Sequence, residues 1–180
     1  MKKLQKNLKL TVILALLCAL SIVMGKYLAI RGGDVMRFSL ENMPIIFAGI
    51  AFGPIAGAVV GAVADLVGCV MVGYTINPLV TIGAAAIGAV SGSLHLFLKK
   101  KSLNPILSTV IEVASAHIIG SVIIKTIGLS AYYSMPFAAL MLWRTINYLI
   151  VGALDGTILC VLFSNKEIIT QIKKIKGGEK

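Results

Sequence analysis

The chain has 180 residues, of which 58% are hydrophobic and only 13% are charged, and its mean hydropathy is +0.95. Too few polar side chains remain to cover a surface in water, so the composition excludes a soluble globular protein and predicts a single transmembrane domain over residues 1–180. The formal net charge of +10 comes largely from lysine clusters beside apolar runs. Such clusters are typical of membrane topology signals and do not resemble a nucleic-acid surface.

Six apolar segments follow one another along the chain. We expect helices at residues 10–30, 43–52, 54–74, 79–98, 105–128 and 136–163. Most of them approach or exceed the roughly 20 residues that cross a bilayer. The first segment follows several lysines and also resembles a signal peptide, but no clean cleavage site comes after it, so we expect a retained helix. The sequence therefore predicts an all-α, integral membrane six-helix bundle.

The lysines set the expected orientation. They gather in the N-terminal tail, at Lys99–Lys101 and in the C-terminal tail, and an even number of spans puts all three on one side. By the positive-inside rule that side is cytoplasmic, which predicts a multi-pass protein of the cell membrane with both termini inside. The loops at residues 31–42, 73–78 and 128–135 then face outward.

The segment at residues 43–52 is too short to cross a bilayer unaided, so it must be protected by protein or meet a locally thinned bilayer. Glycines recur there and in the next segment, at Gly49, Gly53, Gly57, Gly61 and Gly68. Small residues at a spacing of four let helix backbones approach closely. These two segments are predicted to form a tightly packed interior.

Two stretches carry a resemblance to a known family. They are "RFSLENMPIIFAGIAFGPIAGAVVGAVADLVG" from Arg37 to Gly68 and "GYTINPLVTIGAAAIGAVSG" from Gly73 to Gly92. The sequence resembles the substrate-binding S components of energy-coupling factor (ECF) vitamin transporters, and among them the folate-specific members. The resemblance implies a non-enzymatic protein that binds its vitamin in an outward-facing cavity, capped by the loop between the first two helices.

The resemblance also implies partners. Members of this family work with a transmembrane coupling subunit and two cytoplasmic ATPase subunits, and the A-x-x-x-A pair of their first helix, matched here by Ala15 and Ala19, docks onto the coupling subunit. No phosphate-binding G-x-x-x-x-G-K-[ST] motif occurs in this chain. Another vitamin, such as riboflavin, thiamine or pantothenate, is an open alternative, and a small stand-alone carrier or channel is a further one.

The last apolar segment carries a polar stripe. Arg144, Asn147, Tyr148 and Asp155 stand at i, i+3, i+4 and i+11, so they share one helix face that should point into the bundle. A guanidinium can hold a carboxylate of folate bidentately or stack on its pterin ring. Arg144 could equally neutralise a carboxylate of the bundle, Glu112 or Asp65, and Asp155 could be structural or pair with a cation.

Further substrate-binding candidates lie on the outward loops and beside the stripe. Trp143 and Tyr148 offer aromatic faces, although Trp143 points a quarter turn away and could instead be an interfacial anchor. Tyr74 and Asn77 can offer donors and acceptors to a pterin edge, while Asn77 could merely cap the next helix. Arg37 is the candidate from the capping loop, whose other charged residues, Arg31, Asp34 and Glu41, we expect to be mainly solvated.

Other site types lack support in the sequence. His95 and His117 lie near opposite ends of different segments, and the three cysteines have no ligand spacing, so we expect no metal. No nucleophile stands with a base and an orienting group, so we expect no catalysis and no cofactor.

Overall fold

The computed structural model describes residues 2–32, 36–101, 103–134 and 136–176, with only the backbone described for residues 2–7, 31–32, 36–37 and 133. The elements in chain order are α1 (Lys2–Ile22), η1 (Val23–Tyr27), β1 (Ile30–Gly32), β2 (Met36–Phe38), α2 (Asn42–Phe52), α3 (Pro54–Val72), α4 (Pro78–Lys100), α5 (Pro105–Ala116), η2 (His117–Ile124), α6 (Lys125–Tyr133), α7 (Phe137–Ser164) and α8 (Lys166–Lys176), where η1 and η2 are π-helical. The described chain is almost entirely helical, which confirms the predicted class.

Five helices are long and apolar enough to cross a membrane. They are Leu8–Tyr27, Pro54–Val72, Pro78–Lys100, Pro105–Tyr132 and Phe137–Ser164. The fourth of these is α5, η2 and α6 joined end to end, and the remaining predicted segment is α2, with 11 residues. All six predicted segments are helical, while the count of six spans and the orientation of the termini stay predictions.

Two helix ends, one hairpin and one additional helix differ from the expectation. The first helix ends at Tyr27, and strand β1 already begins at Ile30. The fifth predicted helix continues past Gly128 to Tyr133, because the glycine lies against α4, where an added Cβ would be 2.7 Å from the Cβ of Leu79. The hairpin of β1 and β2 and the terminal helix α8 were not predicted.

The interior is built around α2, α3 and α4. Nine of the eleven residues of α2 are buried, so protein covers this short helix, as expected. The backbones of α3 and α4 touch at glycines: a Cβ added to Gly88 would lie 2.7 Å from the Cα of Gly57, and one added to Gly57 would lie 2.6 Å from the carbonyl oxygen of Gly88. The small-residue spacing of the sequence is therefore used for close backbone packing.

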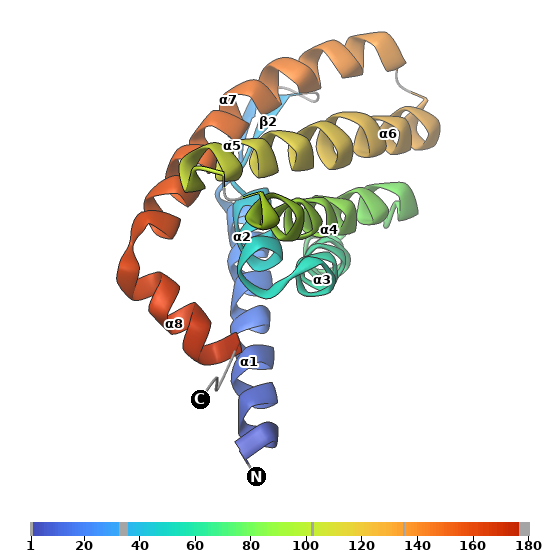
Figure 1. Ribbon diagram of the computed structural model, residues 1–180. Coiled ribbons are helices and arrows are strands. Elements are labelled where there is room, and N and C mark those ends of the chain that lie inside the picture. The colour runs from blue at the N-terminus through green and yellow to red at the C-terminus, as the bar shows by residue number, and fades with distance from the viewer. Residues whose placement is uncertain (1, 33–35, 102, 135, 177–180) are drawn as a thin grey trace.

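Figure 1 shows how the other elements surround this interior. Helix α4 and the continuous helix α5–η2–α6 lie side by side, and α7 runs along the latter before α8 turns back toward α1. The first turns of α1 extend beyond the other helices. The antiparallel strands β1 and β2 pair Arg31 with Arg37, and β2 packs against α7. The hairpin and the residues after it thereby come to lie near the polar stripe of α7.

Candidate functional site

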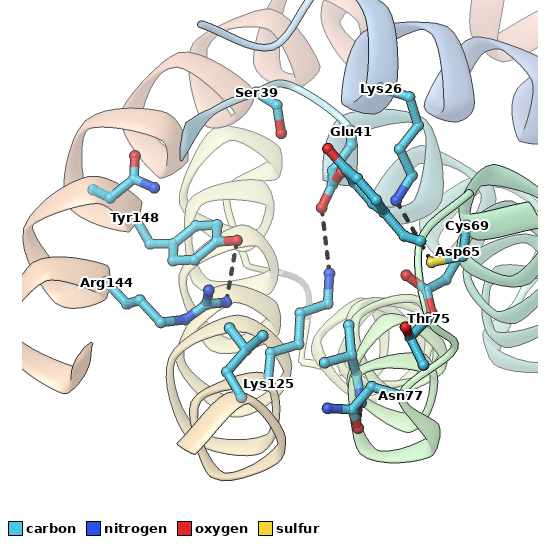
Figure 2. A pocket seen from close by; sticks show the side chains of 14 residues that line it. Lys26, Ser39, Glu41, Asp65, Cys69, Thr75, Asn77, Lys125, Arg144 and Tyr148 are labelled. Atoms are coloured by element: carbon cyan, nitrogen blue, oxygen red, sulfur yellow. Dashed lines mark hydrogen bonds and ion pairs between the residues drawn. The ribbon is translucent and has the colours of Figure 1, made fainter. Parts of the chain in front are cut away.

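A cavity of about 240 Å³ lies within the bundle, close to the residues that follow the β1–β2 hairpin. Its wall combines η1, the residues that follow β2, α3, the loop between α3 and α4, α6 and α7. Figure 2 shows side chains from these elements converging on it. The charged groups on the wall are Lys26, Glu41, Asp65, Lys125 and Arg144, so cations outnumber carboxylates by one.

Arg144 and Tyr148 form the α7 side of the cavity. The Nε and Nη2 atoms of Arg144 donate to the backbone carbonyl of Ser121 in η2, at 3.1 and 2.8 Å. Nη2 also lies 3.4 Å from the Tyr148 hydroxyl, and the guanidinium carbon is 5.2 Å from the centre of that ring. In the described part of the chain Nη1 makes no hydrogen bond. The guanidinium is thus fixed on one edge and keeps donors for an anion.

Lys125 enters the cavity from α6. Its side chain is 6% exposed, and its ammonium lies 3.5 Å from a carboxylate oxygen of Glu41, a side chain that is 20% exposed. The stem of Lys125 crosses Gly83, where an added Cβ would lie 2.6 Å from the Lys125 Cγ. A buried ammonium is costly without a counter-charge, so Glu41 is a structural partner of this lysine. The expectation that Glu41 is mainly solvated was wrong.

Lys26 enters from the opposite side, on η1. Its ammonium is 3.8 Å from the sulfur of Cys69 and 5.5 Å from the centre of the Tyr74 ring. Its stem lies over Gly68, where a Cβ would be 2.8 Å from the Lys26 Cε. Figure 2 shows Lys26 and Lys125 reaching into the cavity from different helices. With Arg144 they supply three cations around one space.

Asp65 and Asn77 are held by the framework. The Thr81 hydroxyl donates to a carboxylate oxygen of Asp65 at 2.7 Å. The Asn77 side-chain oxygen accepts from the backbone N–H groups of Leu79 and Val80 at the start of α4, and its amide nitrogen donates to the carbonyl of Gly128 at 2.8 Å. Asn77 therefore caps α4 and ties it to α6, although it also lines the cavity.

Behind Tyr148 the polar stripe continues into the bundle. The rings of Tyr148 and His117 stack with centroids 5.2 Å apart, and His117 Nε2 lies 3.0 Å from the Asp155 carboxylate. Both members of this pair are buried. Asp155 thus has the cation-forming partner that the sequence left open, and the pair supports the ring that faces the cavity.

The structure brings together most of the predicted site residues. Tyr74, Asn77, Arg144, Asn147 and Tyr148 all line the cavity. The expected inward face of α7 is confirmed, because Asn147 is buried and Asp155 fully so. The alternative ion pairs of Arg144 are absent from the described residues, where the carboxylate of Glu112 lies against His95.

Two predicted residues are not placed with the others. Trp143 does not line the cavity and is 41% exposed, which favours the anchor interpretation. Arg37 lies on β2, but its side chain is outside the described part of the structure, as is all of Asp34. A contact of Arg37 with a ligand stays a prediction.

Sequence reasoning missed Lys26 and Lys125. Each stands inside an apolar run, in "IVMGKYLAI" and "SVIIKTIGL", and a charge in such a position marks a functional candidate in a membrane protein. The rule that selected Arg144 therefore also selects these two lysines. Their convergence could not be predicted, because it depends on how η1 and α6 pack around α3 and α4.

The sequence resembles one protein family and one curated transporter. The family model described as "ECF transporter, substrate-specific component" matches residues 6–163. The folate transporter FolT of Clostridium novyi (strain NT) is 26% identical over 112 residues, covering 58% of this chain and 60% of that protein. The chain thus spans less than two thirds of this curated relative.

Solved structures share the fold. A crystal structure of FolT bound with folic acid superposes with a TM-score of 0.68 at 23% identity, covering 87% of this chain and 92% of that one. The S-component for biotin from an ECF-type ABC transporter gives a TM-score of 0.66 at 18% identity, covering 89% and 94%. At these identities the likeness extends to the fold alone.

Proposed function

The chain belongs to the family of ECF transporter substrate-specific components, and from that premise we propose that it captures folate in the cavity walled by Lys26, Lys125 and Arg144. The convergence of these three cations beside two tyrosines is the observation that carries the proposal. Folate presents two glutamyl carboxylates and a planar pterin. Arginine and lysine complement the carboxylates, and aromatic rings complement the pterin.

The residues divide between the two ends of the ligand. The Arg144 guanidinium, already fixed by the Ser121 carbonyl, holds one carboxylate through its remaining donors, and a lysine serves the other. Tyr74 and Tyr148 offer ring faces for the pterin, and the side-chain amide of Asn147 forms hydrogen bonds with the polar edge of the pterin. Asn77 shapes the wall, because its own amide is engaged as the cap of α4.

We expect the segment between the first two helices to cap the cavity on its outer side. Ser39 and Glu41 of this segment line the wall, which supports the expectation of a capping loop, and Arg37 of β2 is a further contact of the ligand. The cavity of about 240 Å³ is slightly below the roughly 300–1,000 Å³ of typical ligand pockets. Folate therefore fills it and extends toward the capping segment.

Delivery depends on partners. We expect one domain of six membrane-embedded helices with both termini in the cytoplasm, and no catalytic activity in this chain. Ala15 and Ala19 are exposed on α1, as a docking groove for another helix requires. A transmembrane coupling subunit binds there, and two cytoplasmic ATPases supply the energy.

Calorimetric titration of the purified chain tests the folate assignment. Folate should bind saturably, while riboflavin, thiamine, pantothenate and biotin should not. Lys125→Met should weaken folate binding at least about 10-fold, because it removes a cation and leaves the Glu41 carboxylate facing the ligand. The matched control Lys166→Met, on the exposed start of α8, should bind as the wild type does. Saturable binding of another vitamin in place of folate would refute the assignment.

A further inference from the structure

A second cavity, of about 400 Å³, is lined by the end of α4, the first turns of α5 and the inner side of α8. It shares no lining residue with the first cavity among the described residues. Helix α8 forms one wall, and it contacts α1, α2 and α7. Its isoleucines and lysines alternate with helical spacing in "KEIITQIKKIK", which is typical of a helix that lies in the membrane interface.

The rim of this cavity is basic. Lys99 of α4 and Lys173 and Lys176 of α8 line it. Partial burial lowers the pKa of the Lys176 ammonium, and the nearby charge of Lys99 lowers it further. No carboxylate bridges these lysines among the described residues. Because their like charges repel one another, an anion bound between them would be stabilised.

The floor of this cavity is polar. The side chain of Glu112 is 1% exposed, and its carboxylate lies 3.0 Å from the Nδ1 atom of His95. Both residues line the cavity. This single carboxylate is engaged by His95 and is outnumbered by the three lysines at the rim.

Most of the remaining wall is apolar. Leu103, Phe163, Ile169 and Ile172 line it, from the α4–α5 connection, α7 and α8. Phe163 in turn stacks on Phe47 of α2, with ring centroids 5.2 Å apart. A rim of lysines above an apolar wall, at the end of membrane-embedded helices, matches a molecule with an anionic head and a hydrocarbon tail.

We propose that this cavity is a binding site for an anionic phospholipid. Its phosphate sits among Lys99, Lys173 and Lys176, and an acyl chain lies along Phe163 and Ile172. A soluble phosphate has the same charge but leaves the apolar wall uncovered, and a zwitterionic lipid covers the wall but brings its own ammonium to the lysines. The site does not depend on which vitamin the first cavity takes.

Native mass spectrometry of the full chain in detergent tests this site. Phosphatidylglycerol should be retained at least about 10-fold more tightly than phosphatidylcholine. The triple variant Lys99→Gln, Lys173→Gln, Lys176→Gln should lose about 10-fold of that retention. The control Lys100→Gln, Lys166→Gln, Lys174→Gln makes the same charge change on neighbouring exposed positions that do not line the cavity, and should stay within about 2-fold of the wild type.

Three outcomes overturn the proposal. Equal retention of the two lipids shows that the lysines do not select charge. An equal loss of phosphatidylglycerol retention in both triple variants shows that net charge, and not this cavity, attracts the lipid. Displacement of phosphatidylglycerol by equimolar glycerol 3-phosphate shows that the cavity takes a soluble anion. The three lysines make no ion pair among the described residues, so thermal unfolding of the variants should match the wild type and make binding the only readout that changes.

Discussion

Replacement of Arg144 separates a ligand contact from a structural one. In Arg144→Ala the ligand loses a desolvated, hydrogen-bonded partner for a carboxylate, which costs about 2–5 kcal/mol of binding free energy. At about 1.4 kcal/mol for each tenfold change, Kd should rise at least roughly 30-fold. The bundle also loses the two hydrogen bonds to the Ser121 carbonyl, at 2.8 and 3.1 Å, and an unsatisfied buried acceptor costs about 1–3 kcal/mol of stability.

Two further variants make the assay decisive. Arg144→Lys keeps the charge but cannot bond bidentately, so folate affinity should recover little. Tyr148→Phe keeps the ring and removes only the hydroxyl that lies 3.4 Å from Arg144, so Kd should change less than about 5-fold. Folate titration by calorimetry, with thermal unfolding as the check on folding, measures both effects. A folded Arg144→Ala protein with wild-type Kd would show that Arg144 serves only the bundle.

The other predictions concern coupling, packing and capping. Ala15→Leu with Ala19→Leu should keep folate affinity but abolish co-purification with the coupling subunit, because leucines fill the groove; loss of folate binding would instead indicate packing inside the bundle. Gly88→Ala should lower the melting temperature markedly, since its methyl meets the backbone of α3, whereas Gly156→Ala, with nothing within 4 Å of its Cβ, should not. Asn77→Ala should lower stability by about 1–2 kcal/mol through the lost cap, with a smaller effect on folate Kd than Arg144→Ala; an unchanged melting temperature would contradict the capping role.

The fold followed from the sequence where hydropathy and spacing decide structure. Apolar length located the six helices, and the glycines around Gly57 predicted close backbone packing, for which the structure supplies α4 as the partner. The hairpin was missed because strands of three residues carry too few side chains for an alternating pattern. Helix α8 was missed because its lysines were interpreted as a topology signal and its apolar residues are too spaced to form a span.

Part of the candidate site could be predicted from the sequence. The spacing of Arg144, Asn147 and Tyr148 fixed one wall, since helical geometry alone puts them on one face. Sequence could not choose a partner for Arg144, because that choice depends on where η2 places the Ser121 carbonyl. The sequence also could not predict that Lys26 and Lys125 line the same cavity, because they lie on helices almost a hundred residues apart in the chain.

The most direct measurement identifies the small molecule that the protein selects. The chain is produced in cells supplied with equimolar folate, riboflavin, thiamine, pantothenate and biotin, and the vitamin that co-elutes after purification is identified by absorbance and mass spectrometry. Folate should be enriched over the other four, and Arg144→Ala should elute without it. Enrichment of a different vitamin, or of none of the five, would contradict the account.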